Sequence, residues 1–241
     1  MSYDDPRLAA IYDIDNPDGP DHDFFRRVAD EHGAADIIDL GCGTGILTVT
    51  LTGLGRAVTG IDPAPAMLDQ ARNRPGGDKV TWVQGTSEQI APGSADLVVM
   101  SGNVAMHILH EQWQTTLENI AKSLRPAGIL VFDSRNPESR AWQNWNDELG
   151  ERDTPVGRLR ESLATDPPDE DGVVVMHCHN EFDDGTVLDE DQRLQFRSHA
   201  QIVQDIAAAG LAVEETYSDW YKQPFRGGPG QPLMVFLAKR P

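Results

Sequence analysis

A glycine-rich turn follows directly on an apolar run near residue 40, and its residues limit the ligands that it could bind. The stretch IIDLGCGTGI (37–46) places Gly41, Gly43 and Gly45 at alternate positions. Glycines in a strand-to-helix turn let the backbone approach a ligand closely and aim N–H groups at it. Such a turn usually binds a nucleotide cofactor, so hydride, phosphoryl and methyl transfer are the chemistries to separate.

The residues of this turn oppose two of the three chemistries. Ile46 stands where a dinucleotide-binding turn has its third glycine, which opposes a dehydrogenase. No Lys-Ser or Lys-Thr pair follows the turn, although a phosphate-binding loop of the Walker type requires one. Methyl transfer is the chemistry that remains.

Two acidic residues narrow the choice of ligand further. Asp39 stands two residues before Gly41, where its charge would repel a pyrophosphate but suit a positively charged amino group. Asp62 stands 21 residues after Gly41, at the end of the next apolar run, where a carboxylate accepts the hydroxyls of a ribose. An adenosine joined to a cationic amino-acid tail has these features, so the sequence predicts S-adenosylmethionine as the cofactor.

Short apolar, β-branched runs alternate with amphipathic helical patterns over residues 36–133. The runs predict strands at 35–40, 57–61, 79–83, 96–100 and 128–134. The amphipathic patterns predict helices at 45–53, 63–74 and 111–124. Because the strands are almost continuously apolar and alternate with helices, they predict a parallel sheet that is covered on both faces.

The pattern changes after Ser134. Residues 139–171 are rich in Pro, Asp and Glu and show no clear period. Two strand-like stretches, 172–182 and 186–198, surround DDGT, which predicts a hairpin because Asp-Gly suits a tight turn. The remaining predicted elements are a helix at 199–209 and strands at 211–219 and 233–240.

Three stretches in the first half of the chain also carry a family resemblance. DLGCGTG, GIDPAPAMLDQAR and ADLVVMSGNVAMHIL resemble, in order and spacing, the class I S-adenosylmethionine-dependent methyltransferases, particularly small-molecule enzymes of bacterial type. The resemblance covers about residues 36–135. YDIDNPDGPDHDFF (12–25) and DSRNP (133–137) resemble one subset of that family, whereas residues 139–198 resemble it only weakly.

Together, these patterns and the resemblance predict an α/β fold. The expected core is a doubly wound, Rossmann-like, mostly parallel seven-stranded sheet, and an inserted, partly antiparallel cap lies between its fifth and sixth strands. The expected parts are an N-terminal helical lid (1–35), a cofactor-binding core (36–138 and 199–241) and a substrate cap (139–198).

The resemblance implies roles for individual residues. Asp39 and the glycine turn would hold the methionine end of the cofactor, Asp62 the ribose, and Met67 would lie against the adenine. Thr86 stands where the family commonly has an Asp that accepts from the adenine amino group, which implies a weaker contact. Tyr12, in the lid, would cover the cofactor. The full set of implied cofactor-binding residues is Tyr12, Asp39, Gly41, Cys42, Gly43, Gly45, Asp62, Pro63, Met67, Thr86, Ser87, Ser101, Gly102 and Asn103.

Histidines and aromatic residues are the candidates for contact with the methyl acceptor. His107 follows the fourth predicted strand, where the family often places acceptor-facing side chains, and a histidine there is a candidate base. His177 and His179 share one face of a predicted cap strand and could line the pocket. No third ligand accompanies them, so no metal site is predicted. The other predicted pocket residues are His22, Trp142, Trp145, Trp220 and Tyr221.

The net charge of −19 is concentrated in two segments of the chain. Residues 1–35 carry nine acidic and three basic side chains, and residues 147–191 carry fifteen and three. This balance argues against a nucleic-acid partner and favours a neutral or cationic acceptor. The absence of a long apolar run and of a signal peptide, with only two cysteines, predicts a cytoplasmic location and no membrane span.

Methyl transfer to a nitrogen or oxygen of a small molecule is therefore the predicted function, by in-line displacement in a pocket that positions the acceptor. A binding protein that holds S-adenosylmethionine without turnover is the alternative. The sequence leaves open the choice between nitrogen and oxygen and the oligomeric state.

Overall fold

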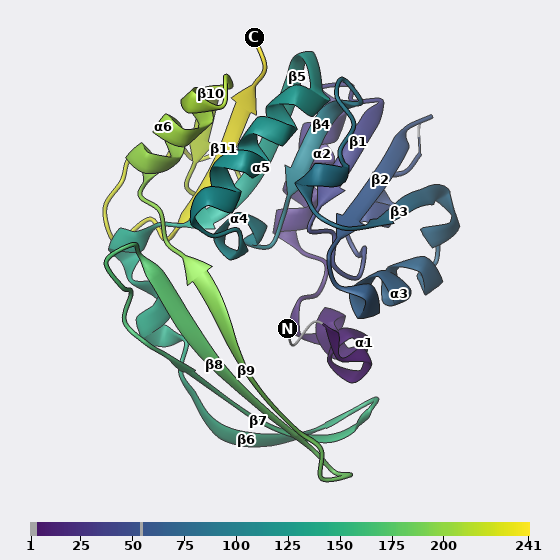
Figure 1. Ribbon diagram of the computed structural model, residues 1–241, viewed down its shortest axis with the longest axis vertical. Helices are drawn as coiled ribbons and strands as arrows, with labels where there is room; N and C mark the ends of the chain where they lie inside the picture. The colour runs from purple at the N-terminus through teal and green to yellow at the C-terminus, as the bar shows by residue number, and fades with distance from the viewer. Residues whose placement is uncertain (1–3, 54) are drawn as a thin grey trace.

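The computed structural model describes residues 4–53 and 55–241 and contains a seven-stranded central sheet (Figure 1). The strand order is β10-β11-β5-β4-β1-β2-β3, and β11 runs antiparallel to the other six strands. The strands are β1 (Asp36–Leu40), β2 (Ala57–Asp62), β3 (Val80–Gln84), β4 (Ala95–Met100), β5 (Leu124–Arg135), β10 (Ala212–Tyr217) and β11 (Leu233–Lys239). The predicted α/β fold is confirmed.

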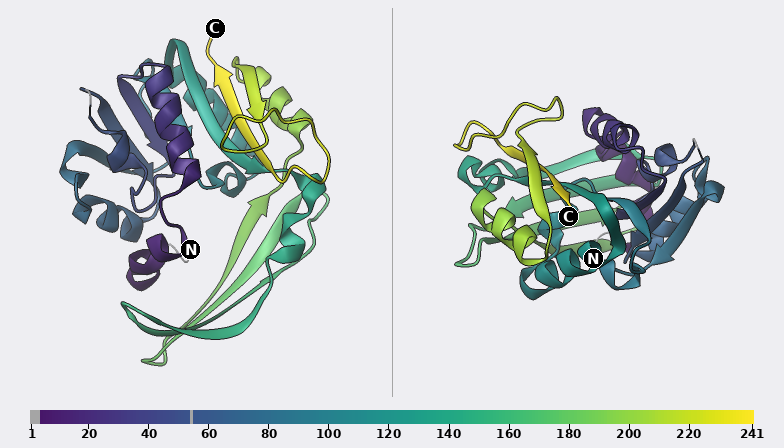
Figure 2. Two further views of the ribbon diagram at one scale, coloured as in Figure 1. Left: turned by 180° about the vertical axis from the view of Figure 1, so that it is seen from behind. Right: turned by 90° about the horizontal axis from the view of Figure 1, so that it is seen from above.

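Helices cover both faces of the central sheet (Figure 2). The described α-helices are α1 (Pro6–Asp15), α2 (Pro20–Glu31), α3 (Pro65–Asn73), α4 (Val104–His107), α5 (His110–Ser123) and α6 (His199–Ala208). Short 3₁₀ turns are η2 (Thr48–Leu51), η3 (Gly77–Lys79), η4 (Ser87–Gln89), η5 (Pro137–Ser139) and η6 (Ala141–Asn144).

Strand side chains alternate between two apolar layers. Ile38 and Leu130 belong to the layer under α5 and α6, whereas Ile37 and Val99 belong to the layer under α2. All are buried, as expected of a parallel sheet covered on both sides. Helix α2 fills its layer with Phe24 and Phe25, which are fully buried. This helix therefore packs on the core, and within the predicted lid (1–35) only α1 stands apart; residues 1–3 lie outside the described residues.

A second sheet forms the cap, which extends away from the core (Figure 1). It consists of β6 (Asp147–Thr154), β7 (Gly157–Thr165), β8 (Val173–Phe182) and β9 (Val187–Gln195), all paired antiparallel. The β8–β9 hairpin was predicted, but β6 and β7 fall in the stretch that showed no period. The chain enters this sheet after β5 and returns to the core at α6, as predicted.

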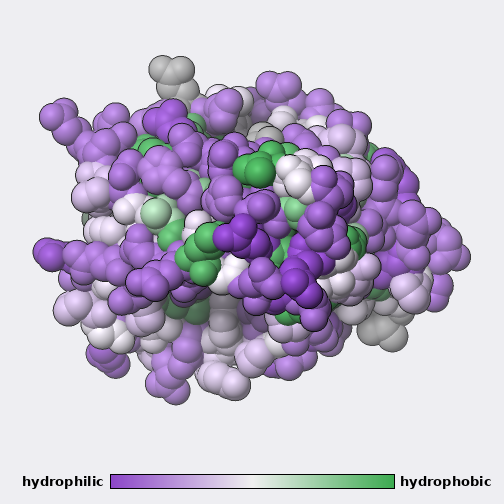
Figure 3. All heavy atoms as spheres, turned by 90° about the horizontal axis from the view of Figure 1, so that it is seen from below, coloured by the Kyte–Doolittle hydropathy of each residue, from purple (hydrophilic) through white to green (hydrophobic). Residues whose placement is uncertain are grey.

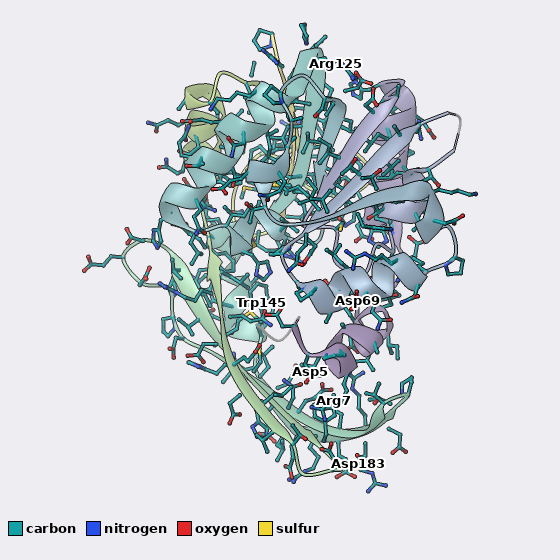
Figure 4. The ribbon with its side chains drawn as sticks, turned by 45° about the vertical axis from the view of Figure 1, so that its right-hand side comes forward. Asp5, Arg7, Asp69, Arg125, Trp145 and Asp183 are labelled. Atoms are coloured by element: carbon teal, nitrogen blue, oxygen red, sulfur yellow. The ribbon has the colours of Figure 1, made fainter. Side chains whose placement is uncertain are left out.

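Helix α1 lies between the core and the cap. On the core side Ala9 and Tyr12 pack against α3. On the cap side Ile11 packs against Phe182, and the guanidinium of Arg7 lies 3.8 Å from the centre of the Phe182 ring. Figure 4 shows Arg7 on the side of α1 that faces the cap hairpin. Helix α1 is therefore in contact with both parts of the molecule.

One predicted helix is largely missing. The stretch 45–53 forms only the 3₁₀ turn η2. Its threonines turn their hydroxyls back onto the chain: Thr50 Oγ1 donates to Leu47 O (2.6 Å) and Thr52 Oγ1 donates to Val49 O (2.7 Å). These bonds and β-branching disfavour a longer helix. In the part of the chain that the structure describes, no helix is long and apolar enough to cross a membrane.

Candidate active site

The three glycines of the turn after β1 have different functions. All have positive φ, at 76° for Gly41, 52° for Gly43 and 73° for Gly45. A Cβ on Gly41 would lie 2.5 Å from the Val104 side chain, and one on Gly45 would lie 2.5 Å from Trp82. A Cβ on Gly43 would meet no atom within 4 Å. Gly41 and Gly45 are thus required by packing, and Gly43 borders open space where a ligand fits.

Asp62 closes the turn from the end of β2. Its Oδ2 accepts from Gly43 N (2.8 Å) and its Oδ1 accepts from Ala64 N (2.8 Å). The side chain is buried, and burial is the main cause that raises its pKa. A carboxylate has about four acceptor positions, so the ribose hydroxyls could still donate to it. Asp62 therefore ends β2 beside the glycine turn, and its contact with a ribose stays a prediction.

Asp39 is buried at the end of β1 with one oxygen unused. Its Oδ2 accepts from Thr48 Oγ1 (2.6 Å), whereas the buried Oδ1 has no hydrogen-bond partner. Desolvation raises the pKa of Asp39 to about 6, and the nearby His22 opposes that rise. A buried oxygen without a hydrogen-bond partner destabilises the folded chain, and a ligand that donates a hydrogen bond to it would remove this penalty. A cationic amino group fits this position.

The raised pKa of Asp39 predicts an unusual pH dependence of stability. A carboxyl group with a higher pKa in the folded chain than the usual ~3.9 holds its proton more tightly when folded, so the free energy of unfolding falls as pH rises from about 4 to about 6. We expect Asp39→Asn to remove the contribution of Asp39 to this slope and to increase stability at pH 8 by on the order of 2 kcal/mol. Urea denaturation at pH 4.5 and 8 measures both effects. The exposed Asp153→Asn is the control, and a less stable Asp39→Asn protein at pH 8 would contradict the prediction.

The lid helix closes over the glycine turn. Asp13 of α1 accepts from Thr44 Oγ1 (2.5 Å) and also pairs with Arg74 beyond α3. Tyr12 and Met67 pack in one apolar cluster, and their contact with an adenosine stays a prediction. Burial raises the pKa of Tyr12, and the charges of Asp62, Asp13 and Asp133 raise it further.

Of the two residues predicted to meet the edge of the adenine, Thr86 and Ser87, only Thr86 is exposed. Thr86 is exposed, but its hydroxyl caps η4 by accepting from Glu88 N (3.4 Å). Ser87 is buried, and its Oγ bonds to Thr116 (3.3 Å) and Asn119 (3.2 Å) of α5. Pro63 is exposed beside Asp62. The Ser87 side chain therefore anchors α5 instead of pointing toward a ligand.

Cys42, in the middle of the turn, is buried. Burial, together with the charges of Asp39 and Asp62, raises the pKa of its thiol well above the usual value. The thiol therefore stays protonated and serves packing, with Sγ close to Gly60.

The loop after β4 meets an aspartate that the sequence analysis did not select. Asn103 adopts a left-handed conformation (φ 64°) next to Ser101 and Gly102, and its N–H donates to Asp133 Oδ2 (3.0 Å). Asp133, at the end of β5, is 2% exposed, and desolvation raises its pKa to about 6. Oδ1 of Asp133 and Oδ1 of Asn103 are buried without hydrogen-bond partners. The sequence does contain a signal for Asp133, because this acidic residue stands near the end of an otherwise apolar strand.

His107 ends α4 next to this loop. Its side chain is accessible to water, yet the surrounding protein lowers its pKa to about 4 by desolvation. His107 is therefore neutral near pH 7 and a weaker base than the sequence led us to expect.

Two predicted aromatic residues lie where the cap joins the core. Trp142 and Trp145 pack against Phe196, with ring centres 4.8 and 5.6 Å away, in one cluster with Met106 of α4. Figure 4 shows Trp145 in this position. Met106 precedes His107 in α4, so the two tryptophans pack near the end of that helix, and their contact with a methyl acceptor stays a prediction.

Four predicted pocket residues lie elsewhere. His177 and His179 do share a face of β8, but they pair there with Asp191 (2.7 Å) and Asp189 (2.6 Å). The alternate positions, such as Val174 and Phe182, face α4 and α1, so the two histidines lie on the opposite face. Trp220 packs on Phe24 and Phe25, and Tyr221 is 71% exposed, which removes both from the pocket.

His22 lies at the first turn of α2 and also differs from the prediction. It is buried, and its Nδ1 lies 2.8 Å from Asp18 Oδ1. Because its charge acts on Asp39, His22 lies on the cofactor side of the site rather than in the acceptor pocket.

The surface around the cap is polar. Seen from below, it is largely hydrophilic, with small separate apolar groups (Figure 3). A pocket of about 580 Å³ lies where α5, α6 and the cap meet, lined partly by Glu170, Asp171 and Asp205. None of the predicted site residues lines it, so it is distinct from the glycine turn.

Comparisons with known proteins agree with this geometry. Residues 37–128 match the family model described as a methyltransferase domain. Glycine N-methyltransferase of Rattus norvegicus is 31% identical over 123 residues, which cover 44% of this chain and 42% of that protein. The cypemycin N-terminal methyltransferase of a Streptomyces species is 25% identical over 202 residues, covering 83% and 81%. The chain thus spans less than half the length of glycine N-methyltransferase.

The CcbJ methyltransferase from Streptomyces caelestis has the same fold, with a TM-score of 0.78, 22% identity, and coverage of 100% of this chain and 98% of that one. Residues 37–128 are therefore similar to methyltransferase domains, and the described chain has the fold of the class I methyltransferases.

Proposed function

We propose that this protein transfers a methyl group from S-adenosylmethionine to a nitrogen or oxygen of a small molecule. One observation carries the proposal: at one edge of the sheet, the open position at Gly43 lies between two buried carboxylates, Asp39 and Asp62. This arrangement suits a ribose with a cationic tail and disfavours a pyrophosphate.

The residues fit the cofactor in a consistent order. Asp62 would accept from the ribose hydroxyls, and Asp39 Oδ1 would accept from the amino group. Tyr12 and Met67 would cover the adenosine. When bound, the cofactor supplies a methyl group that is activated for attack by its positive sulfur.

The remaining task of the protein is to position the acceptor. Alignment of two reactants in one site lowers the barrier without any nucleophilic residue. Loop 101–103, His107 and the two cap-side tryptophans Trp142 and Trp145 are placed for this task. Neutral His107 would accept a hydrogen bond from the acceptor. The acidic balance of residues 147–191 supports a neutral or cationic acceptor.

Calorimetry with S-adenosylhomocysteine, and separately with NAD, tests the cofactor site. We expect binding of the first compound only, and at about 100 times its Kd it should stabilise the fold by roughly 2.7 kcal/mol. Binding of NAD alone would contradict the proposal.

Radiolabelled methyl transfer then tests turnover. We expect label on at least one member of a panel of amines, phenols and carboxylic acids. Binding of S-adenosylhomocysteine without transfer to any member would instead support the non-catalytic alternative, for which the exposed Thr86 in place of an acidic residue is the one favourable feature.

A further inference from the structure

Three buried oxygen atoms at the carboxyl edge of the sheet share one property. Oδ1 of Asp39, Oδ1 of Asn103 and Oδ1 of Asp133 have no hydrogen-bond partner. Asp39 and Asp133 lie near the ends of β1 and β5, and Asn103 follows β4; these three strands are neighbours in the sheet. All three atoms are acceptors. A ligand that satisfies them must therefore bring several hydrogen-bond donors.

The strand order separates Asp133 from the cofactor side. Strand β4 lies between β1 and β5, so these two strands are about 9–10 Å apart. Asp133 lies two residues beyond Val131, which is level with Asp39 in the sheet. The glycine turn and Asp62 belong to the β1–β2 side, whereas β5 continues through η5 and η6 into the cap. Asp133 is therefore on the strand that leads directly to Trp142 and Trp145, which pack with Met106 where the cap joins the core.

We infer that Asp133 binds the amino group of the methyl acceptor, which makes the acceptor an amine; this inference rests on the proposed function. Oδ2 of Asp133 is occupied by the N–H of Asn103 (3.0 Å), so Oδ1 is the oxygen that receives a ligand donor. An amine has enough N–H groups to donate to Asp133 and Asn103 together. An alcohol or phenol has one donor, and a carboxylate has none and is repelled.

Arg135 does not satisfy the free Oδ1 of Asp133. It follows Asp133 by two residues on the same face of β5, and its charge lowers the pKa of Asp133. Across residues 4–53 and 55–241, however, no ion pair within 4.0 Å joins the two side chains, and the buried Nε of Arg135 itself has no hydrogen-bond partner. The other charge acting on Asp133 is that of Asp21, which also favours a cation.

Matched pairs of ligands test this inference on protein saturated with S-adenosylhomocysteine. The pairs are benzylamine and benzyl alcohol, glucosamine and glucose, and glycinamide and glycolamide. In at least one pair we expect calorimetry to show the amine bound at least tenfold more tightly by the wild type. Asp133→Asn keeps the shape but removes the charge, and should reduce this preference to within about threefold. Asp153→Asn, whose side chain is 89% exposed, removes one charge from the cap and should retain the preference.

The outcomes separate this inference from the proposed function. No preference for the amine in any pair, or a preference that survives in Asp133→Asn, overturns the inference, while binding of S-adenosylhomocysteine upholds the cofactor site. A large loss of S-adenosylhomocysteine affinity in Asp133→Asn would also overturn it, because Asp133 would then belong to the cofactor. Failure of the wild type to bind S-adenosylhomocysteine is the result that counts against the proposed function itself.

Discussion

Replacement of Asp62 by Ala is expected to weaken binding of S-adenosylhomocysteine by at least about a hundredfold, or about 2.7 kcal/mol. The substitution removes the acceptor for the ribose hydroxyls, and hydrogen bonds to a charged group contribute about 1.5–3 kcal/mol each. It also leaves the N–H groups of Gly43 and Ala64 without their partner, so the turn loses its shape.

Isothermal titration calorimetry measures the effect, and Asp69→Ala is the matched control. Asp69 lies on α3, its side chain is 70% exposed, and it forms an ion pair with Arg72 (2.9 Å); Figure 4 labels it beside this helix. This control should bind within about twofold of the wild type, because exposed ion pairs contribute little. An Asp62→Ala protein that is folded by circular dichroism and binds within threefold would show that the ribose lies elsewhere.

Gly43→Ala is expected mainly to weaken binding of S-adenosylhomocysteine, whereas Gly45→Ala is expected mainly to destabilise the fold. A methyl group on Gly43 enters the space assigned to the cofactor but meets no protein atom within 4 Å, so affinity should fall by at least tenfold. The fold should lose only about 1–2 kcal/mol, the cost of a left-handed alanine. A methyl group on Gly45 collides with Trp82 at 2.5 Å and carries the same backbone cost. It should destabilise the fold by about 3 kcal/mol.

The two glycine variants serve as controls for each other. Urea denaturation gives the stability of each protein, and calorimetry at a temperature where both are folded gives the affinity. If Gly43→Ala proved the less stable of the two, or if it bound S-adenosylhomocysteine as the wild type does, the open position at Gly43 would not be part of the cofactor site.

The strands of the core could be predicted because each one is marked by its own residues and not by contacts with distant segments. Continuous apolar runs mark strands β1 to β4 to within a residue or two, and Asp39 and Asp62 stand at strand ends where a parallel sheet must bring them to one edge. Strand β6 gives no such signal. Its sequence, DELGERDT, is mostly exposed, so no buried face imposes an alternating pattern.

The acceptor side was harder to predict because it depends on contacts between distant segments. Strand periodicity correctly predicted that His177 and His179 share a face, but only the packing of Val174 and Phe182 decides which face lies against α4 and α1. Trp220 is another example, because its place on α2 depends on residues nearly 200 positions away. Asp133 was missed because its neighbour Asn103 comes from another strand.

The two-sided attachment of α1 makes cofactor and acceptor binding thermodynamically dependent on each other. The helix contacts the glycine turn through Asp13 and the cap through Arg7 and through Asp15, which pairs with Arg152 (2.6 Å). A ten-residue helix is marginal by itself, so a ligand that orders it on one side lowers the entropy lost in ordering it on the other. Linkage then requires reciprocity: the factor by which the cofactor strengthens acceptor binding equals the factor by which the acceptor strengthens cofactor binding.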